Sequence, residues 1–176
     1  MKVESTAIDG VRVLHMEPIE DQRGFFARSF CRDTFRAWGL EHDFAQSSVS
    51  YNAKRGTLRG LHYQPAPHAE VKLIRCTRGV VHDVVVDLRP DSATFRRSMG
   101  FELSADNHLA VYVPHGVAHG FLSLADGTEV LYQISVPHID GRAAGVRWND
   151  PAFSIEWPMS PSIMSDRDRL YPDFAP

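Results

Sequence analysis

Cysteine and long apolar runs are scarce in this sequence. It contains only two cysteines, Cys31 and Cys76, in unrelated local contexts, and they form neither a CxxC pair nor a zinc-type Cys/His spacing. We expect both thiols to be reduced and packed as small apolar side chains. No stretch approaches the roughly 20 apolar residues of a membrane-spanning helix, and the opening MKVESTAIDGVRV lacks the apolar core of a signal peptide. These absences favour a cytoplasmic protein without membrane association.

An excess of positive charge is also missing. The formal net charge is -3 with neutral histidines, which excludes the generally cationic surface of nucleic-acid-binding proteins. Hydrophobic residues make up 43% of the 176 positions, enough to build a core. The sequence contains no repeat, linker or low-complexity segment. Its length fits one domain, which we expect to span residues 1–176.

Short segments rich in β-branched and aromatic residues run through most of the chain. Turn residues such as PDS, PHG and ADGT separate segments such as VKLIRCT, VVHDVVVDL, LAVYVP, AHGFLSL and EVLYQISV. This spacing predicts an all-β sandwich or closed barrel rather than alternating helices and strands. We expect one helix in RDTFRAWGL, capped by Asp33 or Thr34 and ended by Gly39, and a tail from Trp157 that wraps the surface.

Polar residues interrupt otherwise apolar strand faces. Because side chains alternate along a strand, three pairs share a face: Lys72 with Ile74, His119 with Phe121, and Tyr132 with Val130. A barrel interior that holds a ligand has this pattern.

Arg59 and His62 lie on opposite faces of a regular strand in TLRGLHYQ. Both can reach one pocket only if the strand contains a bulge or bend, which Gly60 could supply. The stretch from Arg55 to Arg75 holds the densest set of polar and charged side chains, and PHGVAHGF and SDRD offer further partners. We therefore predict a polar pocket around this stretch.

Metal binding is one chemistry open to such a pocket. Separate strands could supply His62, Glu70 and His119 as ligands. However, the sequence lacks a His-x-His pair here, and His68 lies in a proline-rich loop that does not constrain its position. The spacing therefore favours metal-free chemistry.

Proton transfer is the alternative. A histidine with a carboxylate partner is a competent base near neutral pH, because the unperturbed pKa of histidine is about 6.5. A tyrosine can return a proton to a carbanion, especially where nearby cations lower its pKa. Lysine or arginine can stabilise an enolate oxygen in a dry pocket. Composition and spacing predict a β-barrel with a polar pocket, but they name no reaction.

Long motifs in a characteristic order resemble the dTDP-4-dehydrorhamnose 3,5-epimerase family. They are DQRGFFARSF, GTLRGLHYQ, KLIRCTRGVVHDVVVDLR, YVPHGVAHGF, TEVLYQIS, GVRWNDPAFSIEWP and SDRD. The resemblance implies a cupin-type jelly-roll barrel with a few short helices. It also implies a homodimer with exchanged N-terminal strands and an epimerisation without metal or other cofactor, at C3 and C5 of a nucleotide-linked 4-keto-6-deoxy sugar.

The resemblance also assigns roles to residues of this chain. By their motifs, His62 matches the family's base, Asp168 its carboxylate partner and Tyr132 its acid. Lys72 and His119 match pocket residues near the sugar. Arg23 and Arg59 match cations that bind the diphosphate, whose negative charge suits arginine.

Departures from the family pattern lie away from the catalytic positions. Arg28 and Ala143 replace glutamates, Arg167 replaces the lysine of SxKD, Gln46-Ser47-Ser48 replaces QDN or QxN, and Val136-Pro137-His138 replaces a tyrosine-rich stretch. Several of these family positions contact the ligand. We therefore expect substrate contacts from Arg28, Gln46, Ser48 and Arg167, while the identity of the nucleotide and sugar stays open, CDP- or GDP-linked sugars and heptoses included.

Other functions stay open as well. The chain could invert one carbon only, or bind a sugar nucleotide without turnover. A 3,4-ketoisomerase of related fold is less favoured, because the sequence around Tyr132 is closer to the epimerases. The product would serve cell-surface polysaccharide or glycosylated natural-product synthesis.

Overall fold

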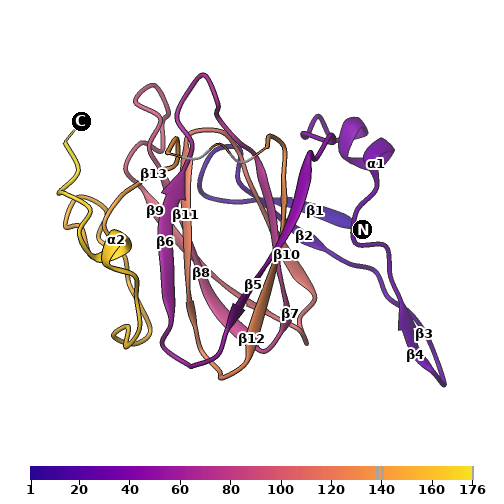
Figure 1. Ribbon diagram of the computed structural model, residues 1–176. Coiled ribbons are helices and arrows are strands. Elements are labelled where there is room, and N and C mark those ends of the chain that lie inside the picture. The colour runs from indigo at the N-terminus through magenta and orange to yellow at the C-terminus, as the bar shows by residue number, and fades with distance from the viewer. Residues whose placement is uncertain (138, 140, 176) are drawn as a thin grey trace.

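Two antiparallel sheets face each other across the core. The computed structural model describes residues 1–137, 139 and 141–175, and Figure 1 shows the sheets side by side. The first, here the β7 sheet, has the order β1 (Lys2–Ser5), β2 (Arg12–His15), β10 (Leu109–Val113), β7 (Lys72–Arg78), β12 (Thr128–Ile134) and β5 (Gln46–Asn52). The second, the β11 sheet, has the order β13 (Ala144–Gly145), β6 (Leu58–Tyr63), β11 (Val117–Ser123), β8 (Val80–Asp87) and β9 (Ser98–Ser104). This architecture confirms the all-β prediction.

The space between the sheets is filled by apolar side chains at alternate strand positions. Ile74, Val85, Phe121 and Val130 are all fully buried in one cluster. Burying a side chain of this size stabilises a fold by about 1.5–3 kcal/mol. This cluster packs the two sheets against each other.

A short helix, α1 (Arg32–Ala37), covers the outer face of the β7 sheet. Phe35 is fully buried there and packs in a cluster with Leu73 and Tyr112. The predicted helix is confirmed, and Gly39 follows it with φ +69°. The predicted cap is wrong: Cys31 is the N-cap residue and makes no side-chain cap bond, because the helix starts earlier and places Asp33 and Thr34 inside the first turn.

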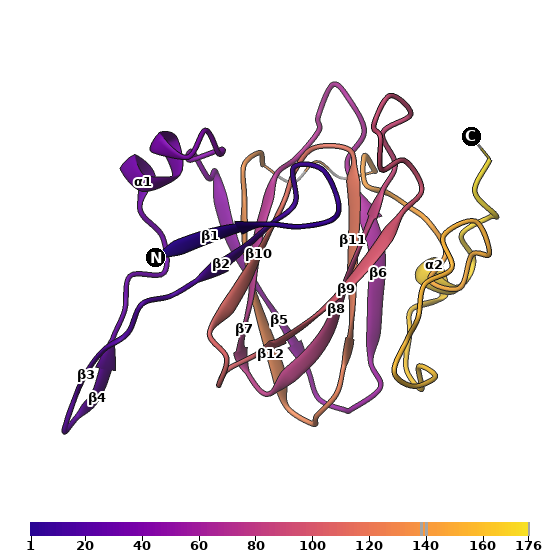
Figure 2. The ribbon, with the colours of Figure 1, turned by 180° about the vertical axis from the view of Figure 1, so that it is seen from behind.

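The C-terminal tail lies along the outer face of the β11 sheet, as Figure 2 shows from behind. Phe153, Trp157 and Phe174 pack against buried residues of β6 and β8. One helical turn, α2 (Asp166–Arg169), interrupts the tail, and Ser165 caps it by accepting a hydrogen bond from the Asp168 N–H. The prediction that the tail wraps the surface is confirmed.

A hairpin of β3 (Ile19–Asp21) and β4 (Gly24–Phe26) projects away from the barrel (Figure 1). Its apolar side chains face solvent: Ile19 is 72% exposed and Phe26 is 74% exposed. Among the described residues, no helix is long and apolar enough to cross a membrane.

Candidate active site

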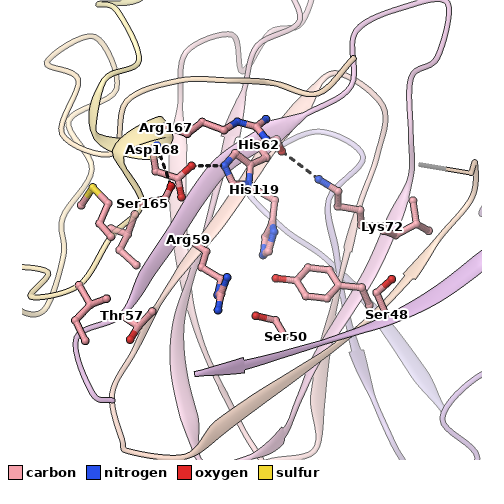
Figure 3. A pocket seen from close by; sticks show the side chains of 15 residues that line it. Ser48, Ser50, Thr57, Arg59, His62, Lys72, His119, Ser165, Arg167 and Asp168 are labelled. Carbon is pink, nitrogen blue, oxygen red and sulfur yellow. Dashed lines mark hydrogen bonds and ion pairs between the residues drawn. The ribbon is translucent and has the colours of Figure 1, made fainter. Parts of the chain in front are cut away.

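A cavity of about 600 Å³ opens between the two sheets at the side of the C-terminal tail. Figure 3 shows the side chains that line it. Strands of both sheets and the tail contribute the polar ones, which are Ser48, Ser50, Thr57, Arg59, His62, Lys72, His119, Tyr132, Ser165, Arg167 and Asp168.

His62 and Asp168 form a hydrogen-bonded pair in the cavity wall, 106 residues apart in the chain. His62 Nε2 lies 2.7 Å from Asp168 Oδ1, and the Gly60 N–H donates to Asp168 Oδ2 at 3.1 Å. Burial alone would raise the pKa of Asp168. The hydrogen bond and charge of His62, with the donors Gly60 and Ser165, outweigh burial and lower this pKa. The ionised carboxylate therefore favours a proton on Nε2 and leaves the lone pair on Nδ1.

A bulge in β6 lets Arg59 and His62 share the cavity. In the pairing with β11, His119 lies opposite His62, whereas Phe121 lies opposite Arg59, so β6 contains one residue more than its partner. Gly60 has φ +133°, and a Cβ there would lie 2.5 Å from the Gly120 Cα. The predicted bulge at Gly60 is confirmed, because only glycine allows this approach.

Tyr132 projects from β12, beside His119. The two ring centroids are 5.9 Å apart at an interplanar angle of 77°. Burial raises the pKa of the Tyr132 phenol, the charge of Asp83 raises it further, and Arg59 opposes both. The nearby cation does act to lower this pKa, but burial outweighs it. The phenol stays protonated and can donate its proton.

Lys72 and His119 each have a carboxylate partner. Lys72 Nζ lies 2.8 Å from Glu70 Oε1 and donates to the His62 carbonyl oxygen at 3.1 Å. His119 Nε2 lies 2.7 Å from Asp83 Oδ2. In the described part of the chain, no group of three or more His, Cys, Asp or Glu side chains is arranged to hold a metal ion.

The predicted substrate-binding residues fall into two groups. Arg59, Ser48 and Arg167 line the cavity together with Lys72 and His119, and Arg59 is fixed by Asn52 Oδ1 at 2.8 Å. The other three lie outside the cavity of this chain. Gln46 pairs with Ile134 at the start of β5, Arg23 pairs with Asp21 at the hairpin tip, and Arg28 is exposed beyond β4. His138, in the divergent stretch after Tyr132, lies outside the described residues.

Sequence reasoning missed Thr57 and three further polar residues of the site. Ser50 lines the cavity two positions from Ser48, so strand alternation could have revealed it. Asp83 is a charged residue within an apolar strand, which is a signal for a buried partner. Ser165 is the first residue of SDRD and caps α2, a local signal that says nothing about the cavity.

The order of strands and the position of the cavity are those of a cupin-type jelly-roll barrel, and the chemistry available inside it is acid–base chemistry. Residues 5–176 match the family model described as dTDP-4-dehydrorhamnose 3,5-epimerase. The chain belongs to this family.

Individual relatives agree over almost their whole lengths. The dTDP-4-dehydrorhamnose 3,5-epimerase of Shigella flexneri is 40% identical over 169 residues, covering 96% of this chain and 93% of that protein. The crystal structure of the Bacillus anthracis enzyme, with TDP and PPi bound, is 42% identical with a TM-score of 0.95, covering 98% and 99% of the two chains. A 3'-monoepimerase from Streptomyces bikiniensis in complex with dTDP-quinovose is 35% identical with a TM-score of 0.89, covering 96% and 85%.

Proposed function

We propose that this protein epimerises a nucleotide-linked 4-keto-6-deoxy sugar, converting dTDP-4-dehydro-6-deoxy-glucose to dTDP-4-dehydro-L-rhamnose. One observation carries the proposal: the His62–Asp168 pair and the Tyr132 phenol line one cavity, although they come from β6, the tail and β12. A base and an acid that face one ligand are what inversion by deprotonation and reprotonation requires.

The reaction follows from carbonyl chemistry. The C4 ketone acidifies the hydrogens on C3 and C5, and His62 removes one of them. Asp168 stabilises the imidazolium that forms, as in a catalytic triad. Tyr132 then donates a proton to the opposite face of the carbon. After each inversion His62 releases its proton to solvent and Tyr132 takes one up, which restores both groups. Two such cycles invert both centres, and no redox cofactor takes part because only protons move.

The enolate between these two steps carries negative charge on the former ketone oxygen. Lys72 is buried and lines the cavity, and His119 lies beside Tyr132. In a cavity of low polarity, a fixed cation and an N–H donor stabilise such charge far better than water does. We assign Lys72 and His119 to this oxygen.

The diphosphate of the substrate needs cations at the cavity mouth. Arg59 supplies one, and its hydrogen bonds to Asn52 and the Tyr51 carbonyl oxygen hold its guanidinium in place. The TDP and PPi bound to the Bacillus anthracis relative support a thymidine diphosphate as the activating group.

We further propose a homodimer in which the β3–β4 hairpins are exchanged. The exposed Ile19 and Phe26 support this proposal, because monomers rarely leave large apolar side chains on a projecting hairpin. In such a dimer, Arg23 and Arg28 serve the cavity of the partner subunit.

Solvent isotope incorporation tests the reaction. We expect dTDP-4-keto-6-deoxyglucose incubated with the protein in D₂O to acquire deuterium at both C3 and C5, read by proton NMR. A carbonyl moved to C3 would instead indicate a ketoisomerase, and binding without label would indicate a non-catalytic barrel.

Single-centre epimerisation is the second candidate. The similarity to the Streptomyces bikiniensis 3'-monoepimerase favours it, since that protein has a comparable TM-score. Deuterium at one carbon only would show inversion of a single centre and would contradict epimerisation at both C3 and C5.

A further inference from the structure

Tyr171 lies two residues after the end of α2 and contacts Arg167. Its hydroxyl oxygen accepts a hydrogen bond from Arg167 Nε at 2.8 Å, and the guanidinium carbon lies 5.9 Å from the centre of its ring. Arg167 lines the cavity, whereas Tyr171 does not touch it. Tyr171 therefore affects the cavity through Arg167.

A glycine makes room for the Tyr171 ring. A Cβ at Gly145 would lie 2.3 to 2.6 Å from three atoms of the Tyr171 side chain. Gly145 is also the strand partner of His62, and the rings of His62 and Tyr171 are 6.2 Å apart at 66°. Because the ring packs against the β13 backbone beside the catalytic strand, its hydroxyl has a fixed position.

Arg167 has a second anchor, a backbone carbonyl oxygen. Its Nη2 donates to the Ala143 carbonyl oxygen at 3.2 Å, and in the part of the chain that the structure describes it forms no ion pair with a carboxylate. Residue 143 is an alanine, so its side chain offers no carboxylate to Arg167. Figure 3 shows the Arg167 side chain running along the rim towards His62. The cation is held in orientation while its charge stays available to a ligand.

We propose that Tyr171 is a positioning residue that orients Arg167 to bind a phosphate of the nucleotide diphosphate. A guanidinium offers paired N–H donors that match phosphate oxygens, and this match depends on the orientation of its plane. The hydroxyl of Tyr171 and the carbonyl of Ala143 fix that plane at two points. This inference rests on the proposed function, because it takes a nucleotide diphosphate as the ligand.

A double-mutant cycle with dTDP as the probe tests the inference by calorimetry. Tyr171→Phe keeps the ring against Gly145 and removes only the hydroxyl. We expect it to weaken dTDP binding about fivefold, the loss typical of one hydrogen bond. Arg167→Ala should weaken binding about tenfold or more, because it removes a charged donor. The double variant should bind no more weakly than Arg167→Ala alone, since Tyr171 acts through Arg167.

Turnover adds a second readout and a matched control. Tyr171→Phe should raise KM and leave kcat within about twofold, because binding rather than proton transfer is affected. Arg169→Ala is the control: Arg169 belongs to the same helical turn, pairs with Asp166 and does not line this cavity. It should bind dTDP like the unaltered protein.

Failure of the positioning role and failure of the proposed function give different results. Normal dTDP binding by Tyr171→Phe, or equal losses from this change with and without Arg167, would overturn the positioning role and leave the proposed function intact. Failure of the unaltered protein to bind dTDP would contradict both.

Discussion

His119 and Asp83 form a second histidine–carboxylate pair in the cavity wall, with 2.7 Å between His119 Nε2 and Asp83 Oδ2. Both side chains are buried, on the neighbouring strands β11 and β8. The carboxylate holds the imidazole ring of His119 in one orientation beside Tyr132. The proposed role of His119 at the enolate oxygen depends on this orientation.

Asp83→Asn tests this relationship. The amide keeps the shape but removes the charge that orients His119. We expect kcat to fall at least ~10-fold with little change in KM, less than the ~10⁴-fold typical of the carboxylate beside a catalytic base. Steady-state kinetics measure the change, and a thermal melt checks that the barrel is folded. An unchanged kcat in a folded variant would remove Asp83 from the mechanism.

Replacement of the proposed acid and of the proposed base should have different consequences. His62→Ala and Tyr132→Phe should each lower the rate of product formation by at least ~100-fold. In D₂O, His62→Ala should also abolish exchange of the C3 and C5 hydrogens. Tyr132→Phe should still allow exchange with retained configuration, because His62 can return a deuteron to the face from which it took the proton. Loss of exchange in both variants would contradict the division of roles.

The proposed exchange of β3–β4 hairpins within a dimer predicts complementation between two inactive variants. In a mixed dimer of Arg23→Ala and His62→Ala subunits, one cavity receives both an intact His62 and the intact Arg23 of its partner. Mixing equal amounts under conditions that allow subunits to exchange should restore about a quarter of the wild-type activity, since half of the dimers are mixed and each has one complete site. Activity no higher than the sum of the two variants would exclude a hairpin that serves the partner.

Acid stability should depend on Asp87, which lies outside the site. Its carboxylate is fully buried and accepts hydrogen bonds from Arg89, Ser92 and Thr94. Burial alone would raise its pKa, but these donors lower it from 3.8 to about 2. A carboxyl whose pKa is lower in the folded state stabilises the protein above its unfolded pKa, and this stability is lost as pH falls through the folded value.

The corresponding stabilisation is about 2 kcal/mol at pH 7, lost between about pH 4 and pH 2. Asp87→Asn should lower the free energy of unfolding at pH 7 by at least this amount and flatten its decrease in that acid range. Urea unfolding at pH 7 and at pH 3 measures both effects. An equally steep acid dependence in the variant would assign the effect to other carboxyls.

Strand alternation predicted the interior positions of Lys72, His119 and Tyr132, and the opposite parity of Arg59 and His62 predicted the bulge. These features depend on the alternation of side chains along a strand, which can be read from the local sequence. The start of α1 was misplaced by two residues or more, because several polar residues compete for a cap and tertiary packing of Phe35 decides between them.

Contacts between distant segments could not be predicted in the same way. No local pattern joins Asp168 to His62, and only the resemblance to a family suggested their pairing. The raised pKa of Tyr132 also escaped prediction, because it depends on how deeply the phenol is buried and on Asp83 from another strand. Burial of this kind is a property of the assembled barrel.

The stretch from Ser165 to Tyr171 belongs to neither sheet. It nevertheless carries the carboxylate that pairs with His62, a cation that lines the cavity and the hydroxyl that accepts a hydrogen bond from this cation. Ligand preference can therefore change through a few substitutions in one short peptide while the scaffold is conserved. For protein engineering, variants could be restricted to the positions of this peptide that face the cavity. Such variants could be screened for binding of other nucleotide sugars while both sheets stay unchanged.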